Sequence, residues 1–387
     1  MGEQIRWQES EEGTEKGILL MSLHCASLLG ALLVLGGGLL SGSAAWPMKL
    51  MKRYQFEHWW FVAMLTGLVV VPWSVTLTFC PNAVKAYSSV PRNTLLTANL
   101  WATGWGIANV LCGLCYVRIG MALTSVIITG LGAAIGVTLP MVVKGSGLFK
   151  DASDPGSPTG LALFGGVGVM LIGVVLAGLA GAGRDRARQQ TDLHSGRFVG
   201  GLLMAVLSGV FSAGMGLAFV YGQGPIIQAM KQEGAGEIPA TFAVWSVALL
   251  GGALVSVLYP AWLIMKNRSW GVLGQSWKEL LLAIIIGANA CLAIVLMGAG
   301  MRMMGALGGS VGLGIQSASW MLGGQGVGFA SGEWRGVYGP PRRKMYLAIL
   351  CLTAAVIIMI FAKFVGTPKG RANSFLQMFT NAQSRCS

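Results

Sequence analysis

The sequence predicts an all-α integral membrane protein with ten transmembrane helices, arranged as two inverted repeats of five helices each. Three observations carry this prediction. Only 11% of the 387 residues are charged, 54% are hydrophobic, and the mean hydropathy is +0.66. Soluble domains carry about 25% charged residues, so these side chains cannot cover a globular surface. The other two observations are ten long apolar runs and short motifs that recur in the same order in both halves.

Each apolar run is long enough for a helix that crosses the ~30 Å hydrocarbon core of a bilayer, which takes about 20 residues. The ten expected spans are 29–49, 58–80, 94–117, 119–143, 159–183, 198–221, 239–264, 280–298, 304–330 and 345–365. The first is the least regular, because the apolar stretch from Lys16 to Lys49 is too long for one upright helix. We expect the triplet Gly36–Gly38 to divide it and residues 17–28 to form an interfacial lead-in.

The net charge of +13 comes from Lys and Arg residues that lie mainly in the short loops between spans. Loops after odd-numbered spans carry fifteen of them and loops after even-numbered spans carry six. The positive-inside rule therefore places the odd-numbered loops in the cytoplasm and both chain termini outside. Lys49, two residues after the helix-breaking Pro47, is interpreted as a snorkelling lysine, with a gate beside the site as the alternative. The absence of a basic stripe with interleaved aromatic residues argues against nucleic acid as a partner.

Cysteines and the N-terminal segment give no sign of redox chemistry or of secretion. "CGLC" at Cys112–Cys115 has the spacing of a redox pair, but it lies in an expected span without a βαβ context. Both cysteines are interpreted as small packing residues. The segment 3–16 is acidic and polar, without the basic region that opens a signal peptide. We expect no metal and no cofactor.

The two halves of the chain echo one another in sequence. "IAN", which ends at Asn109 in the third span, corresponds to "GAN", which ends at Asn289 in the eighth, and "SGSA" (41–44) resembles "SGVFSA" (208–213). Duplicating a unit of five spans inverts the second copy, and inverted repeats are typical of secondary transporters, which bind substrate near the midplane between the repeats. The expected division is a polar tail 1–16, a first repeat 17–183, a basic cytoplasmic loop 184–197, a second repeat 198–365 and a C-terminal tail 366–387.

Ionisable side chains are almost absent from the expected spans. No Asp or Glu lies in the middle of any of them, although a buried carboxylate is what most proton relays use. His58 and His194 fall in loops, which leaves His24 as the one imidazole with a place in the membrane and a weak candidate for proton coupling. Arg118 and Arg302 stand at span ends and are expected to snorkel to lipid headgroups.

Neutral polar side chains gather in the stretch from Gly312 to Trp334, where lipid offers them no hydrogen-bond partners. This helix is therefore expected to face a polar cavity. Amides bond paired hydroxyls and an indole covers the C–H face of a sugar ring, so such a set suits a polyol. Asn and Ser also join helices by hydrogen bonds in membranes, and Trp105 suits an interfacial belt as well. The residues expected to line a substrate site are Trp105, Asn109, Ser212, Gln316, Ser319, Trp320 and Gln325.

Four longer motifs carry a family resemblance. They are "VPWSVTLTFCPNAVKAYSS" (71–89), "WGIANVLCGL" (105–114), "GVFSAGM" (209–215) and "GEW" (332–334). They resemble the L-rhamnose–proton symporter family of the drug/metabolite transporter superfamily. The most specific element is the spacing between a Pro-Trp pair at 72–73 and a Pro-Asn pair at 81–82.

The family pattern places one histidine in the first span and another near position 316. This chain departs from the pattern at both places. Its first span is apolar around Val34, and Gln316 carries an amide that does not titrate near neutral pH. The resemblance therefore leaves open which group of this chain would carry a coupled proton.

The resemblance implies a ten-helix, inverted-repeat protein that carries a 6-deoxyhexose inward with a proton. We accordingly expect a secondary active transporter of a small neutral sugar such as L-rhamnose in a bacterial inner membrane. It would work by alternating access, coupled to a proton or to sodium, and it would not be an enzyme. Two alternatives stay open: a metabolite or drug exporter of the same superfamily, and a non-transporting membrane sugar receptor.

Overall fold

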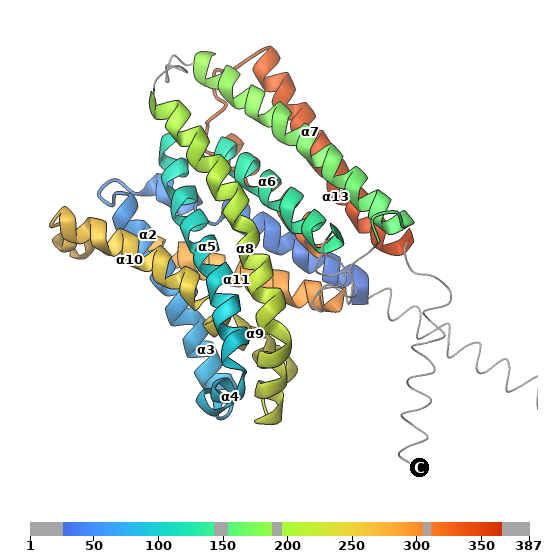
Figure 1. Cartoon of the computed structure of the whole chain (residues 1–387). Coiled ribbons are helices and arrows are strands. Elements are labelled where there is room, and N and C mark those ends of the chain that lie inside the picture. Colours follow the sequence, from blue (N-terminus) through green and yellow to red (C-terminus); the bar gives the residue numbers. More distant parts are fainter. Residues whose placement is uncertain (1–25, 143–153, 188–195, 305–310, 366–387) are drawn as a thin grey trace, which may run out of the picture.

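The computed structural model describes residues 26–142, 154–187, 196–304 and 311–365, and the regular elements in these ranges are all helices (Figure 1). The first half holds a span at Ala26–Leu50 that ends in η1 (Trp46–Leu50), then α2 (Phe56–Met64), η2 (Leu65–Val70), α3 (Val71–Phe79), α4 (Ala83–Ser89), α5 (Arg92–Arg118), α6 (Met121–Val142) and α7 (Pro158–Ala187). The second half holds α8 (Gly196–Gln232), α9 (Glu237–Ala248), α10 (Leu250–Lys266), η4 (Trp270–Gly274), α11 (Trp277–Met303), α12 (Leu313–Ala330) and α13 (Pro340–Val365).

The helices agree in position with the expected spans, but fewer than ten of them have the length and apolar composition of a membrane span. Within the described residues seven do, and the number rises to eight when α9 and α10 are taken as one span bent by 52°. The expected span 119–143 corresponds to α6, and the expected span 304–330 overlaps α12 from Leu313 onward, while its residues 305–310 lie outside the described residues. Both helices lie outside that count. The chain is thus an all-α, multi-pass membrane protein, and the arrangement of ten helices in two inverted repeats stays a prediction.

The glycine triplet in the first span does not divide it, contrary to expectation. Residues 26–43 form one continuous helix through Gly36–Gly38. A Cβ atom built on Gly38 would lie 2.5 Å from the Gln316 carbonyl oxygen, and one built on Gly42 would lie 2.0 Å from the Trp320 carbonyl oxygen. These glycines therefore serve packing, because they let the backbones of the first span and α12 approach closely.

The break between α9 and α10 interrupts an expected membrane span, where freed backbone groups need partners inside the protein. Asn99 of α5 supplies them from a neighbouring helix. Its side-chain Oδ1 accepts a hydrogen bond from the Gly251 amide at 2.7 Å, and its Nδ2 donates to the Val247 carbonyl at 3.0 Å. A single amide side chain thus satisfies a donor and an acceptor that the bend removes from the helical ladder.

The helices around the centre of the molecule position the candidate site. α5 packs along α8 and against α10, while α6 packs between α8 and α12. α7 and α13 pack on each other and lie along one edge of the bundle (Figure 1). Gly106 of α5 and Gly252 of α10 face each other so closely that a Cβ atom on Gly106 would lie 2.6 Å from the Gly252 carbonyl oxygen.

The loop after the first span is held by the start of α11. The buried Glu279 carboxylate accepts hydrogen bonds from the backbone amides of residues 52, 53 and 54 at 2.7–3.2 Å. His58, expected in a loop, lies instead in the first turn of α2 and is buried. Its Nδ1 accepts from the Gln55 amide at 3.1 Å and its Nε2 lies 3.0 Å from the Ser269 hydroxyl, so the ring caps a helix.

Candidate functional site

A cavity of about 310 Å³ lies at the centre of the helix bundle. Side chains of α5, α6, α8, α11 and α12 line it, and a smaller chamber of about 90 Å³ extends it toward the first span and α2. Sites for small molecules usually measure ~300–1,000 Å³, so the cavity has the size of a site for a small ligand.

The structure brings five of the seven residues named from the sequence to the wall of this cavity. They are Trp105, Asn109, Ser212, Gln316 and Trp320. They come from α5, α8 and α12, which are far apart in the chain. All except Ser212 also line the smaller chamber, so they stand where the two spaces join. Contact with a substrate remains a prediction for each.

The other two residues of α12, Ser319 and Gln325, are buried but do not line the cavity. Ser319 faces the first span, since a Cβ atom on Gly38 would lie 2.6 Å from the Ser319 Cβ. His24 lies outside the described residues. The polar residues of α12 therefore lie on different faces of the helix. Gln316 and Trp320 face the cavity, whereas Ser319 faces the first span.

Hydrogen bonds fix some of the lining groups and leave others available. The Asn109 amide donates to the Ser256 hydroxyl at 3.2 Å, and the Ser212 hydroxyl donates to the Gly209 carbonyl at 2.7 Å. The Trp320 indole N–H and the Thr129 hydroxyl are buried and have no hydrogen-bond partner within the part of the chain that the structure describes. Unpaired buried donors carry a free-energy cost of about 1–3 kcal/mol each, which a ligand with acceptor oxygens would relieve.

Sequence reasoning missed several lining residues, among them Ser208, Thr129, Gln223 and Cys112. Ser208 and Thr129 lie in apolar runs on α8 and α6, where one hydroxyl is an ordinary feature of a membrane helix. Cys112 lines the cavity, and Cys115, three residues further on, donates to the Gly201 carbonyl at 3.4 Å. Both are free cysteines, as the interpretation of "CGLC" as packing residues expects.

Arg302 lies in the last turn of α11, at a span end as expected, and its side chain also lines the cavity, which the sequence did not predict. It is the only charged side chain on the cavity wall within the described residues. Its guanidinium forms an ion pair with the Glu237 carboxylate, whose other oxygen lies 3.6 Å from the Lys231 ammonium. We call these three residues the Arg302 face. They lie where α8 and α11 end and α9 begins.

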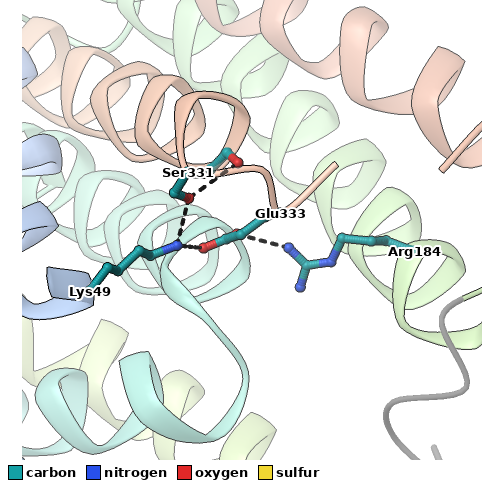
Figure 2. A network of polar contacts seen from close by, with 5 residues as sticks. Lys49, Arg184, Ser331 and Glu333 are labelled. Atoms are coloured by element: carbon teal, nitrogen blue, oxygen red, sulfur yellow. Dashed lines mark hydrogen bonds and ion pairs between the residues drawn. The ribbon is translucent and has the colours of Figure 1, made fainter. Parts of the chain in front are cut away.

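A second ionic network lies beyond the opposite end of α12. The Glu333 carboxylate forms one ion pair with the Lys49 ammonium and another, at 2.9 Å, with the Arg184 guanidinium. Figure 2 shows both cations converging on Glu333, with the Ser331 hydroxyl 2.7 Å from the Lys49 ammonium. We call these four residues the Glu333 face. Lys49 therefore binds protein groups, and the interpretation of it as a snorkelling lysine is wrong.

The Glu333 face joins three parts of the chain. Lys49 ends the first span, Arg184 lies in the last turns of α7, and Glu333 follows α12. The Arg184 guanidinium also lies over the Trp334 ring, 5.5 Å from its centroid. Side-chain exposure is 24% for Lys49, 16% for Glu333 and 7% for Arg184, so the network is largely shielded from solvent.

Membrane-crossing helices around a central cavity that carries neutral polar groups are the architecture of a multi-pass membrane protein that binds a small molecule. The chain belongs to the family of the L-rhamnose-proton symport protein (RhaT), whose model matches residues 23–372. Similar relatives are the L-rhamnose-proton symporters of Yersinia pestis bv. Antiqua (strain Antiqua) and Yersinia pseudotuberculosis serotype O:1b (strain IP 31758). Each is 29% identical over 241 residues, which is 61% of this chain and 67% of the relative. This is a family of transporters and not of enzymes.

Proposed function

We propose that this chain carries a small neutral sugar, such as L-rhamnose, across the cytoplasmic membrane of a bacterium together with a proton. The single observation that carries the proposal is the chemistry of the central cavity. Apolar side chains form most of its wall, its polar groups are amides, hydroxyls and indoles, and its one described charge, Arg302, is already paired with Glu237. A polyol needs neutral donors and acceptors, whereas an anionic substrate needs an unpaired cation. Membership of the symporter family supports the same substrate class.

The transport cycle follows from the position of the site. We infer two inverted five-helix repeats, 17–183 and 198–365, that rock against each other about the cavity. The loop 184–197 would face the cytoplasm, and the tails 1–16 and 366–387 would lie outside. Glycine-lined helix crossings support this motion, since they let backbones slide without interlocked side chains. Trp105, Asn109, Ser212, Gln316, Ser319, Trp320 and Gln325 are the proposed substrate residues.

Solute counterflow in proteoliposomes tests the proposal. Vesicles loaded with unlabelled L-rhamnose should take up labelled L-rhamnose transiently, and protein-free vesicles should not. Uptake should also be accompanied by a sugar-dependent rise in external pH. Binding without exchange would support the receptor alternative. Exchange of amphipathic metabolites, with none of L-rhamnose, would support the exporter alternative.

Variants of the cavity wall locate the site within the same assay. Gln316→Ala removes hydrogen bonds worth about 0.5–1.5 kcal/mol, so the affinity for the sugar should fall roughly 2- to 12-fold. Trp320→Ala removes a ring face and an unpaired indole donor and should weaken binding as well. The matched controls are Gln275→Ala and Trp277→Ala, because both side chains are exposed away from the cavity. If the two cavity variants exchange sugar as well as their controls, the site lies elsewhere.

A further inference from the structure

The smaller chamber beside the central cavity has no role yet in the proposed transport cycle. It measures about 90 Å³, whereas sites that hold a whole small molecule usually measure ~300–1,000 Å³. Trp105, Asn109, Gln316 and Trp320 line both spaces. A ligand in the central cavity can therefore extend one substituent into the chamber, which is too small for the rest of the molecule.

One wall of the chamber consists of apolar side chains alone. Helix α11 contributes Ile286, Ala290, Ile294 and Met297, which follow one another at intervals of three or four residues and so share one face of the helix. We call these four residues the α11 wall. The polar side chains that line the chamber belong to the first span, α2, α5 and α12. The chamber is therefore amphipathic, and its apolar side is formed by α11.

A close helix crossing fixes the α11 wall beside η2. A Cβ atom built on Gly67 would lie 2.4 Å from the Gly287 carbonyl oxygen, so the two backbones touch. Gly67 belongs to η2, a short π-helical segment, and π-helical turns are rare and occur frequently at functional sites. The same segment carries Leu68, which adds a second apolar surface to the chamber. The apolar side of the chamber is thus held in place by backbone contact.

The amides where the chamber joins the cavity determine how a sugar is oriented. Within the described residues the Gln316 amide has no hydrogen-bond partner, so it is available to sugar hydroxyls. The Asn109 amide nitrogen donates to the Ser256 hydroxyl at 3.2 Å and to the Met64 sulfur at 3.1 Å, which leaves its carbonyl oxygen to accept a hydrogen bond. A sugar whose hydroxyls bind these amides turns its least polar edge toward the α11 wall.

We propose that the chamber holds the methyl group of a 6-deoxyhexose, and that Ala290 selects this methyl group against a hydroxymethyl group. Ala290 lies between Ile286 and Ile294 and has the smallest side chain of the α11 wall, which gives the methyl group its room. The additional hydroxyl of a hexose would lose its hydrogen bonds to water against this wall, and that loss is unfavourable. This inference rests on the proposed function, because it names the sugar class that the same site prefers.

Three sugars that differ only in the group at C5 of the ring test the inference in proteoliposomes. L-Rhamnose carries a methyl group there, L-mannose carries a hydroxymethyl group, and L-lyxose carries a hydrogen atom. Each unlabelled sugar competes with labelled L-rhamnose in counterflow, and the half-inhibitory concentrations give the relative affinities. One methyl group in a hydrophobic pocket changes affinity roughly 10- to 200-fold, so the wild-type protein should prefer L-rhamnose to either analogue at least about tenfold.

Two substitutions of Ala290 change the chamber in different ways. Ala290→Leu fills it, so the affinity for L-rhamnose should fall to that for L-lyxose, at least about tenfold, while the affinity for L-lyxose stays unchanged. Ala290→Ser offers a hydroxyl to the hydroxymethyl group and should lower the preference for L-rhamnose over L-mannose roughly 2- to 12-fold. The matched controls Ala288→Leu and Ala288→Ser should keep the wild-type preferences, because Ala288 lies on the same helix, is exposed and lines neither space.

The pattern across the three sugars separates this inference from the proposed function. Equal affinities of the wild-type protein for L-rhamnose and L-mannose would overturn the inference and leave sugar transport standing, as would an unchanged preference in Ala290→Leu. If Ala290→Leu exchanges none of the sugars, the smaller change in Ala290→Ser decides, and an unchanged preference there overturns the inference. If the wild-type protein exchanges none of the three sugars, the proposed function fails and the inference falls with it.

Discussion

Gly42, in the last turn of the continuous helix 26–43, offers the sharpest test of how this bundle is packed. A Cβ atom at this position would lie 2.0 Å from the Trp320 carbonyl oxygen and 2.7 Å from the Gly324 amide nitrogen. Both are backbone atoms of α12 and cannot rotate away. Since such contacts essentially never fall below 3.0 Å, Gly42→Ala requires the two helices to separate by about 1 Å.

The size of the effect follows from a comparison within the same helix. Among the described residues, nothing packs within 4 Å of the Cβ position of Gly36, so Gly36→Ala adds a methyl group without a clash. Both variants gain the same helix preference of Ala over Gly, about 0.8–1 kcal/mol. The difference between them therefore reports the clash alone, which for overpacking is typically 1–3 kcal/mol. We expect Gly42→Ala at the upper end of this range, because backbone is displaced.

Thermal unfolding of the two purified variants measures this difference. At about 2 °C per kcal/mol for a large domain, Gly42→Ala should melt about 2–6 °C below Gly36→Ala. Counterflow should also weaken in Gly42→Ala, because the displaced segment of α12 carries Trp320 on the cavity wall. Equal melting temperatures for the two variants would refute the close crossing of the first span and α12.

Three further outcomes follow from the polar contacts. Glu279→Gln weakens the charge-assisted hydrogen bonds from three backbone amides and should lower the free energy of unfolding by about 1.5–3 kcal/mol. The control Glu57→Gln changes a carboxylate whose hydrogen bond is exposed and should alter the free energy of unfolding little. Equal melting temperatures for the two variants would contradict this. Arg302→Gln should change the affinity for a neutral sugar less than about twofold, because Arg302 is already paired with Glu237. A large loss of affinity in a binding titration would indicate an anionic substrate. Burial raises the pKa of Tyr87 above its ordinary value of 10.0, which the residue keeps in the unfolded chain. The contribution of Tyr87 to stability should therefore be lost as the pH rises above 10.0. The melting temperature of Tyr87→Phe should not show this loss.

Composition and periodicity predict the membrane class and the positions of the helices, because apolar runs of bilayer length leave few alternatives. They do not predict how glycines are used. The triplet at 36–38 looked like a break in the first span, and the structure keeps the helix continuous through it. A glycine lowers the stability of an isolated helix. In the first span this cost is offset by the close packing against α12 that the glycines allow, and no local sequence pattern reveals that packing.

The site was partly predictable for a similar reason. Polar residues in an expected span pointed to α12, and five of the seven named residues line the cavity. Sequence does not show which face of α12 meets the cavity and which meets the first span, so Ser319 was grouped with Gln316. The ionic partner of Lys49 was hidden as well, since Glu333 lies 284 positions away in the chain. Pairs of this kind arise only from the tertiary arrangement.

The distribution of charge in this chain fits the physics of a carrier for an uncharged solute. A fixed charge in the membrane centre costs several kcal/mol, and it would bind water or ions in competition with a sugar. Neutral amides and indoles avoid that cost and still satisfy hydroxyl groups. Charges are better tolerated at the ends of the helices, where they can pair with one another. Lys49, Arg184 and Glu333 occupy such a position, and the single Glu333 carboxylate pairs with both cations.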